Sequence, residues 1–192
     1  MRVCIFVEDL KFLSYHFREL GLCFHFFSNK DNEAFLLVEP DHYENLVGEI
    51  GLAAADDLIK GIADRLSSAL DAETVSARLS DHSFAVLCLG HDHNHSLAQA
   101  ERIREAFHGH ILEVGDRSVN PGVSIGGVQI GEKIASVSQV MGKSSQCLAS
   151  CVGMGGNRVE IFDPAARDRA EEERIQAWVA RIREALAGDH GA

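Results

Sequence analysis

The sequence predicts an α/β fold in which helices flank one central, mostly antiparallel sheet. Strand-like and helical segments alternate from residue 33 to residue 163, an order typical of a mixed sheet with helices packed against it. Two strand-like runs, 74–79 and 83–89, are separated only by a short polar turn, which indicates a β-hairpin and therefore antiparallel neighbours. Hydrophobic residues make up 46% of the 192 residues, enough to build a buried core.

The other expected strands are apolar runs bounded by turn residues. The run "AFLLV", residues 34–38, has no polar interruption and is typical of a strand buried on both faces. Residues 110–130 are expected to form two strands around the turn Gly115–Asp116. The pair Gly155–Gly156 is interpreted as a turn and not as a phosphate-binding loop, because a last strand follows it where a phosphate loop would lead into a helix.

The expected helices show apolar residues that recur every three or four positions. The segment 52–70 is the clearest, with an apolar stripe that comprises Ile59, Ile62, Ala63 and Leu66. A shorter helix follows Pro40, whose fixed φ and missing N–H are tolerated at a helix start. Two further helices are expected at 95–107 and 136–151, and residues 10–20 also have helical spacing.

Composition and charge exclude several classes of function. Asp and Glu number 29 against 18 Lys and Arg, a net charge of −11, which argues against binding to nucleic acids or to anionic membranes. No run of about 18 apolar residues is present, so no insertion into a membrane is expected. Five cysteines without CxxC spacing fit the reduced thiols of a cytosolic protein better than a disulfide framework.

Four motifs, in this order, resemble the GGDEF family, the diguanylate cyclase domains that join two GTP molecules into cyclic di-GMP. They are "FLLVEPDHYENLVGEIGLAAADDLI", "ARLSDHSFAVLCLG" at the place of the signature, "VSIGGVQI" and "GGNRVEIF". The resemblance covers residues 33–163 and implies the palm-like fold of nucleotide cyclases. Residues 1–32 match the family poorly, and residues 164–192 form a charged helix that resembles the linker to an EAL domain. The apolar stripe of that helix comprises Ile175, Trp178, Val179 and Ile182.

The resemblance implies a magnesium site that this chain has lost. The family holds Mg²⁺ with one carboxylate at the end of the first strand, where this chain has Glu39, followed by the carbonyl of Pro40. The second carboxylate comes from the signature, where this chain has His82. Imidazole is a poor ligand for Mg²⁺ and carries no negative charge at neutral pH. Neither a metal nor a cofactor is therefore expected, and GTP binding is doubtful.

The contacts to the nucleotide are expected to be lost as well. The two signature glycines, which let the backbone approach GTP closely, are replaced by Ser80 and Asp81, and Asp81 would also repel the phosphates. Ser83 stands where the family has Glu, whereas the core residue Phe84 is kept. The other lost contacts are an Asn and a phosphate-binding Lys, whose places are taken by Val47 and Val152. The family's inhibitory product site falls on 71–74, "DAET", which does not match it.

Several features have two interpretations. Glu39 and Asp56 are interpreted as the remainder of a nucleotide site, in which Asp56 would face guanine. Asp56 has a second interpretation, as an acidic residue in the first turn of a helix, near its N-terminus. The run "HDHNH", 91–95, is interpreted as a solvated loop before a helix in preference to a metal site. Cys147 and Cys151 are interpreted as small core residues in preference to a shared ligand face.

The hypothesis that follows is a degenerate, catalytically inactive GGDEF domain that acts as a regulatory or interaction module. Within the family, the chain resembles FimX-type regulators of type IV pili and twitching motility in the bacterial cytoplasm. The implied partners are sensor and EAL domains of the same protein, a second copy in a homodimer, and pilus-regulating proteins. Two alternatives stay open: an allosteric domain that binds GTP and tunes a neighbouring EAL domain, and an active cyclase with an unusual site.

Overall fold

The described part of the computed structural model comprises residues 4–5, 33–72, 74–131, 134 and 136–188, and the helix expected at 10–20 lies outside it. Its strands are β1 (Cys4–Ile5), β2 (Glu33–Pro40), β3 (Thr74–Arg78), β4 (Phe84–Leu89), β5 (Leu112–Val114), β6 (Arg117–Val119), β7 (Val123–Ile130) and β8 (Val159–Phe162). Six of them form one sheet in the order β1-β3-β4-β2-β7-β8, and β5 pairs with β6 in a separate ribbon. The four middle strands are antiparallel neighbours, whereas β1 and β8 join the two edges in parallel. This arrangement confirms the predicted fold class.

β2 lies in the middle of the sheet because its apolar run can be buried on both faces. Leu36 is paired with Val86 of β4 on one side and with Gly127 of β7 on the other. Side chains alternate along the strand, so that Leu36 belongs to one hydrophobic core and Phe35 to a second core on the opposite face of the sheet. The end of β2 is thereby held rigidly, and this end carries the candidate site.

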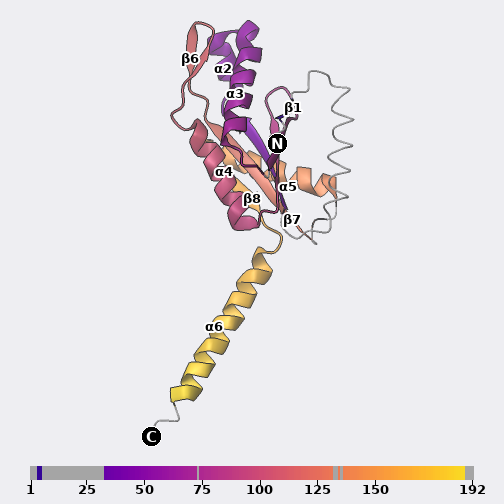
Figure 1. Ribbon diagram of the computed structural model, residues 1–192, viewed down its shortest axis with the longest axis vertical. Helices are drawn as coiled ribbons and strands as arrows, with labels where there is room; N and C mark the ends of the chain where they lie inside the picture. Colours follow the sequence, from indigo (N-terminus) through magenta and orange to yellow (C-terminus); the bar gives the residue numbers. More distant parts are fainter. Residues whose placement is uncertain (1–3, 6–32, 73, 132–133, 135, 189–192) are drawn as a thin grey trace.

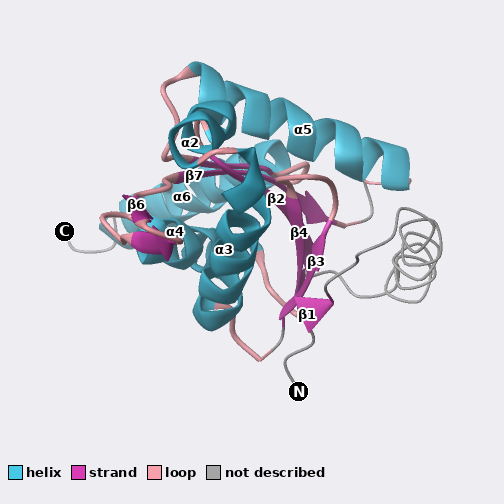
Figure 2. Ribbon diagram, turned by 90° about the horizontal axis from the view of Figure 1, so that it is seen from above, coloured by secondary structure: helices cyan, strands magenta, loops and turns pink. Residues whose placement is uncertain are grey.

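Helices cover both faces of the sheet, as Figure 2 shows. The helical elements are α2 (Tyr43–Ile50), the short 3-10 helix η1 (Leu52–Ala54), α3 (Ala55–Ala69), α4 (His93–Phe107), α5 (Val137–Gly153) and α6 (Ala166–Gly188). α3 and α4 pack on one face and α5 on the other. The predicted apolar stripe of α3 is buried in the first core, which confirms it; its residues are Ile59, Ile62, Ala63 and Leu66.

The N-termini of α4 and α5 are set by side chains that accept hydrogen bonds from the first helical turn. Asp92 accepts from the backbone N–H of His95 at 2.9 Å, so α4 begins at His93, two residues before the expected start. Ser136 accepts from the N–H of Gln139 at 3.2 Å and caps α5 in the same way. A single helix over 52–70 was also expected, but its first turn is the separate 3-10 helix η1.

The prediction of only two strands over residues 110–130 is wrong. β5 and β6 form a small ribbon around Gly115, whose φ of +62° is one that glycine adopts without strain. The chain then breaks at Pro121, which has no N–H to offer a strand, and β7 begins two residues later as a third strand. The apolar residues that looked like one strand therefore belong to two different sheets.

α6 leaves the body of the domain as a separate helix, as Figure 1 shows. Its predicted apolar stripe is largely exposed to solvent, with 64% of Trp178 accessible. Among the helices of the described residues, none is both long enough and apolar enough to cross a membrane.

Three cysteines, Cys88, Cys147 and Cys151, are buried, which confirms that Cys147 and Cys151 are core residues. Burial raises the pKa of Cys88 to about 12 and that of Cys151 to about 11. Both side chains therefore stay protonated at neutral pH, and a protonated thiol reacts poorly with electrophiles.

The test uses a variant in which Cys4 and Cys23 are replaced by Ser, so that only the three buried thiols remain. These thiols are expected to react with an aromatic disulfide reagent at pH 8 at least about a hundredfold more slowly in the folded protein than in the protein unfolded in guanidinium. Stopped-flow absorbance measures both rates. Equal rates in the two conditions would contradict the burial of these side chains.

Candidate functional site

The site lies where β2 ends, and it begins with Glu39. This residue is the seventh of the eight residues of β2 and is partly buried, in register with Ser124 of β7. The hydroxyl of Ser83, which is 7% exposed, donates a hydrogen bond to the Glu39 carboxylate. The first acidic position of the site is therefore already engaged by a side chain of the neighbouring hairpin.

The tip of the β3–β4 hairpin, residues 80–83, is closed by bonds within its own sequence. The backbone N–H of Leu79 donates to the carbonyl of Ser83 at 2.8 Å, and the Ser80 hydroxyl accepts from the N–H of Ser83 at 3.3 Å. Arg78 donates from Nε to the Ser80 carbonyl at 2.9 Å and from Nη2 to the Asp81 carbonyl at 2.7 Å. None of the four tip residues has a positive φ, so no glycine is needed here.

His82 points from this tip onto the first residue of α2. Its ring stacks on the ring of Tyr43, with 4.6 Å between centroids and 14° between planes. Burial raises the pKa of the Tyr43 hydroxyl above its usual value; Arg78 opposes this rise, and Asp81 and Asp56 add to it. Two predicted site residues, Asp56 and Asp81, therefore both act electrostatically on Tyr43.

Asp41 has a structural role that the sequence analysis missed. Its carboxylate accepts from the Ser124 hydroxyl at 2.6 Å and from the backbone N–H of Asn157 at 2.7 Å. A Cβ added at Gly156 would lie 2.6 Å from one oxygen of Asp41, and Gly156 has a φ of +78°. Ser124 of β7 and Asn157, directly after the glycines, thus hold Asp41 in place. Gly155 and Gly156 lie between α5 and β8 with φ of +101° and +78°, which confirms that they form a turn. The available signal was an acidic residue directly after a buried strand.

Of the remaining predicted residues, Val47, Asp56 and Val152, only Asp56 is charged. Val47 is partly buried and packs against the first core, and Asp56 is exposed in the first turn of α3. Negative charge is favourable at that helix end. Val152 is 52% exposed near the C-terminal end of α5, on the opposite face of the sheet from α3.

The three histidines of "HDHNH" face three different carboxylates and do not converge. His91 Nε2 lies 3.4 Å from Asp71, His93 Nδ1 lies 3.8 Å from Asp163, and His95 Nδ1 lies 2.8 Å from Asp92. No group of three potential metal ligands occurs among the residues that the structure describes. The prediction that 91–95 is a solvated loop is wrong for the histidines: His91 is buried, and His93 and His95 both lie in α4.

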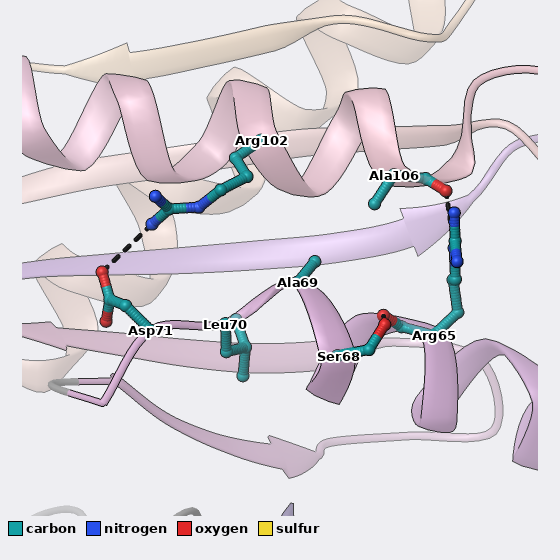
Figure 3. A pocket seen from close by; sticks show the side chains of 7 residues that line it. All are labelled: Arg65, Ser68, Ala69, Leu70, Asp71, Arg102 and Ala106. Carbon is teal, nitrogen blue, oxygen red and sulfur yellow. Dashed lines mark hydrogen bonds and ion pairs between the residues drawn. The ribbon is translucent and has the colours of Figure 1, made fainter.

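A cavity of about 420 Å³ lies between α3 and α4, at the position that the resemblance gives to the inhibitory product site. Figure 3 shows its two arginines pointing to opposite ends. Arg65 donates from Nε to the carbonyl of Ala106 at 2.7 Å, and Arg102 lies 3.1 Å from the carboxylate of Asp71. Asp71, the first residue of "DAET", therefore places a negative charge next to Arg102.

Comparisons with known proteins agree with the fold described above. Diguanylate cyclase A of Treponema denticola is 23% identical over 132 residues, which are 69% of this chain and 36% of that protein, so the chain spans about a third of that relative. The fold is similar to the FimX GGDEF domain from Pseudomonas aeruginosa, with a TM-score of 0.71, 23% identity, and coverage of 78% of this chain and 92% of that one.

The active GGEEF domain of a diguanylate cyclase from Vibrio cholerae is similar as well, with a TM-score of 0.66, 16% identity, and coverage of 79% and 95%. At these identities the solved structures establish the fold alone. The family model for "Diguanylate cyclase, GGDEF domain" matches residues 22–158, well over half of the sequence. The chain therefore belongs to the GGDEF family of diguanylate cyclase domains, which act in cyclic di-GMP signalling.

Proposed function

We propose that this chain is a catalytically inactive GGDEF domain that serves as a regulatory or interaction module in cyclic di-GMP signalling. The observation that carries the proposal is the state of the two metal positions. His82 occupies one of them and stacks on Tyr43. Glu39 occupies the other and accepts a hydrogen bond from the buried Ser83. Two carboxylates that should face a metal are thus replaced by one engaged carboxylate and one imidazole.

The residues present do not fit Mg²⁺. This ion requires oxygen ligands in nearly octahedral geometry, and the resemblance implies two carboxylates for it, at the positions of Glu39 and His82. Of the two side chains, only Glu39 offers oxygens, and Asp81 would bring its charge toward the phosphates that the metal should neutralise. A deprotonated attacking hydroxyl, which the metal would have to stabilise, therefore has no support here.

The contacts to the nucleotide support the same conclusion. Val152 stands where the family places a phosphate-binding Lys, and Val47 stands where it places an Asn. One lost charge-assisted contact costs about 1.5–3 kcal/mol, and each 1.4 kcal/mol is about a factor of ten in rate. The loss of the metal and of the phosphate contact together is expected to lower any cyclase activity by several powers of ten.

The protein incubated overnight with GTP and Mg²⁺ is expected to form no cyclic di-GMP that chromatography can detect. The active GGEEF domain from Vibrio cholerae, assayed in parallel, is the positive control. Robust product formation that disappears in Glu39→Ala would overturn the proposal, because it would show that the carboxylate at this position still holds a metal.

A second candidate function is an allosteric domain that binds GTP without converting it. Glu39 and Asp56 favour it, since both are acidic residues at positions where the resemblance implies metal and guanine contacts. Calorimetry with GTP and Mg²⁺ separates the two candidates. A dissociation constant below about 1 mM, or roughly −4 kcal/mol, would support the allosteric domain, and weaker binding would support an interaction module.

We further propose that the module belongs to a tandem GGDEF–EAL protein in the bacterial cytoplasm, of the type that regulates type IV pili and twitching motility. The charged helix α6 supports this, because it extends away from the rest of the domain and resembles the linker between the GGDEF and EAL domains. Sensor and EAL domains, and a second copy, are then the expected partners. The reading frame on both sides of this sequence tests the proposal.

A further inference from the structure

The direction in which α6 leaves the domain has to be set at its first turn. From 166 to 184, all the side chains that the structure describes are exposed except Val179, which is partly buried. Figure 1 shows the helix extending away from the sheet and from the other helices. Packing along its length therefore contributes little, and the contacts around the short segment between β8 and α6 decide its orientation.

Asp163 is the first of the three residues of that segment. Its side chain is only 4% exposed. One carboxylate oxygen accepts from the backbone N–H of Ala165 at 2.9 Å, and its backbone carbonyl accepts from the N–H of Ala166 at 3.3 Å. These bonds satisfy N–H groups that otherwise have no partner at the start of a helix, so Asp163 fixes the start of α6.

The second carboxylate oxygen of Asp163 faces another helix. It lies 3.8 Å from Nδ1 of His93, the first residue of α4. The same carboxylate thus bonds the start of α6 and lies against the side chain of the first residue of α4. Pro164 follows with a fixed φ, and Phe162 before it lies under the ammonium group of Lys143 of α5, 4.5 Å from the ring centroid.

We infer that Asp163 is a joint that couples the N-terminal turn of α4 to the direction of α6. A partner or modification that displaces the start of α4 would move this carboxylate and, with it, the first turn of α6. The inference depends on the contacts of Asp163 and not on the loss of catalysis. An active domain would have the same joint, so the GTP assays and the experiment below can fail independently.

The experiment measures the distance between two spin labels carried by unnatural amino acids at Ser145 of α5 and Ala180 of α6 in the full chain. Asp163→Ala and His93→Ala are each expected to broaden the distance distribution relative to the parent. Hydrogen exchange of the Ala165 amide, which loses its side-chain acceptor in Asp163→Ala, is expected to accelerate about fivefold, the factor for one lost helix cap.

His95→Ala is the matched control, because His95 lies on the same helix, is exposed and pairs with Asp92 instead. It is expected to leave the distribution unchanged. An unchanged distribution in His93→Ala, or equal broadening in His95→Ala, would overturn the inference. His93→Ala keeps the test decisive if Asp163→Ala does not fold, because it leaves the start of α6 intact.

Discussion

Restoring the family's residues at six positions is expected to give the protein Mg²⁺-dependent GTP binding with a dissociation constant well below 1 mM. The changes are Val47→Asn, Ser80→Gly, Asp81→Gly, His82→Asp, Ser83→Glu and Val152→Lys. They return a second carboxylate for the metal, remove the charge that opposes the phosphates and supply one cation. Two charge-assisted contacts are together worth about 3–6 kcal/mol, or about two to four powers of ten in affinity. Calorimetry with and without Mg²⁺ measures the effect.

The contribution of the metal to the affinity for GTP can be separated from the contributions of the other restored residues, because His82 can be left in its stack on Tyr43. A five-fold variant that retains His82 keeps the stack and lacks the second carboxylate, so its affinity for GTP is expected to be independent of Mg²⁺. Glu39→Ala in the six-fold variant removes the first carboxylate and is expected to abolish the Mg²⁺ dependence of GTP binding as well. If the five-fold variant bound GTP as tightly as the six-fold variant, His82 would not be the residue that excludes the metal.

Features that depend on neighbours in the sequence were predictable. The uninterrupted apolar run of β2, the hairpin of β3 and β4, and the stripe Ile59–Leu66 on α3 all follow from local periodicity, and the structure has each of them. The two interpretations of the paired cysteines could also be weighed correctly, because small apolar residues at helical spacing are more common in a core than at a ligand site.

Features that depend on contacts between distant residues were not predictable. Ser83 and Glu39 are 44 positions apart, and nothing in either motif indicates that the hydroxyl and the carboxylate meet. Asp41 accepts a hydrogen bond from the backbone of Asn157, 116 positions further along the chain. The burial of His91 was missed for the same reason, since its acidic neighbour Asp71 comes from the loop between α3 and β3. A polar loop looks solvated until the elements around it are known.

The close packing of α5 on β7 depends on a single position of the strand. Gly126 of β7 lies directly beneath α5, and a Cβ added there would be 2.6 Å from Cα of Leu148 and in collision with the backbone carbonyl of Ser144. On either side of Leu148 the α5 residues on this face are small: Ser144 is fully buried, and the thiol of Cys151 lies 3.5 Å from the carbonyl of Ile125.

Gly126→Ala is therefore expected to lower the free energy of unfolding by about 3 kcal/mol, the upper range for an overpacked core. The clash is with backbone atoms, which no change of rotamer can relieve, so α5 has to move away from the sheet and loses contact with the second core. Urea denaturation followed by circular dichroism measures the change. Gly131→Ala, just beyond the same strand, is the control, because a Cβ there meets no atom within 4 Å, and it is expected to change stability by less than about 1 kcal/mol. Equal stability of the two variants would mean that α5 does not approach β7 as closely as the structure has it.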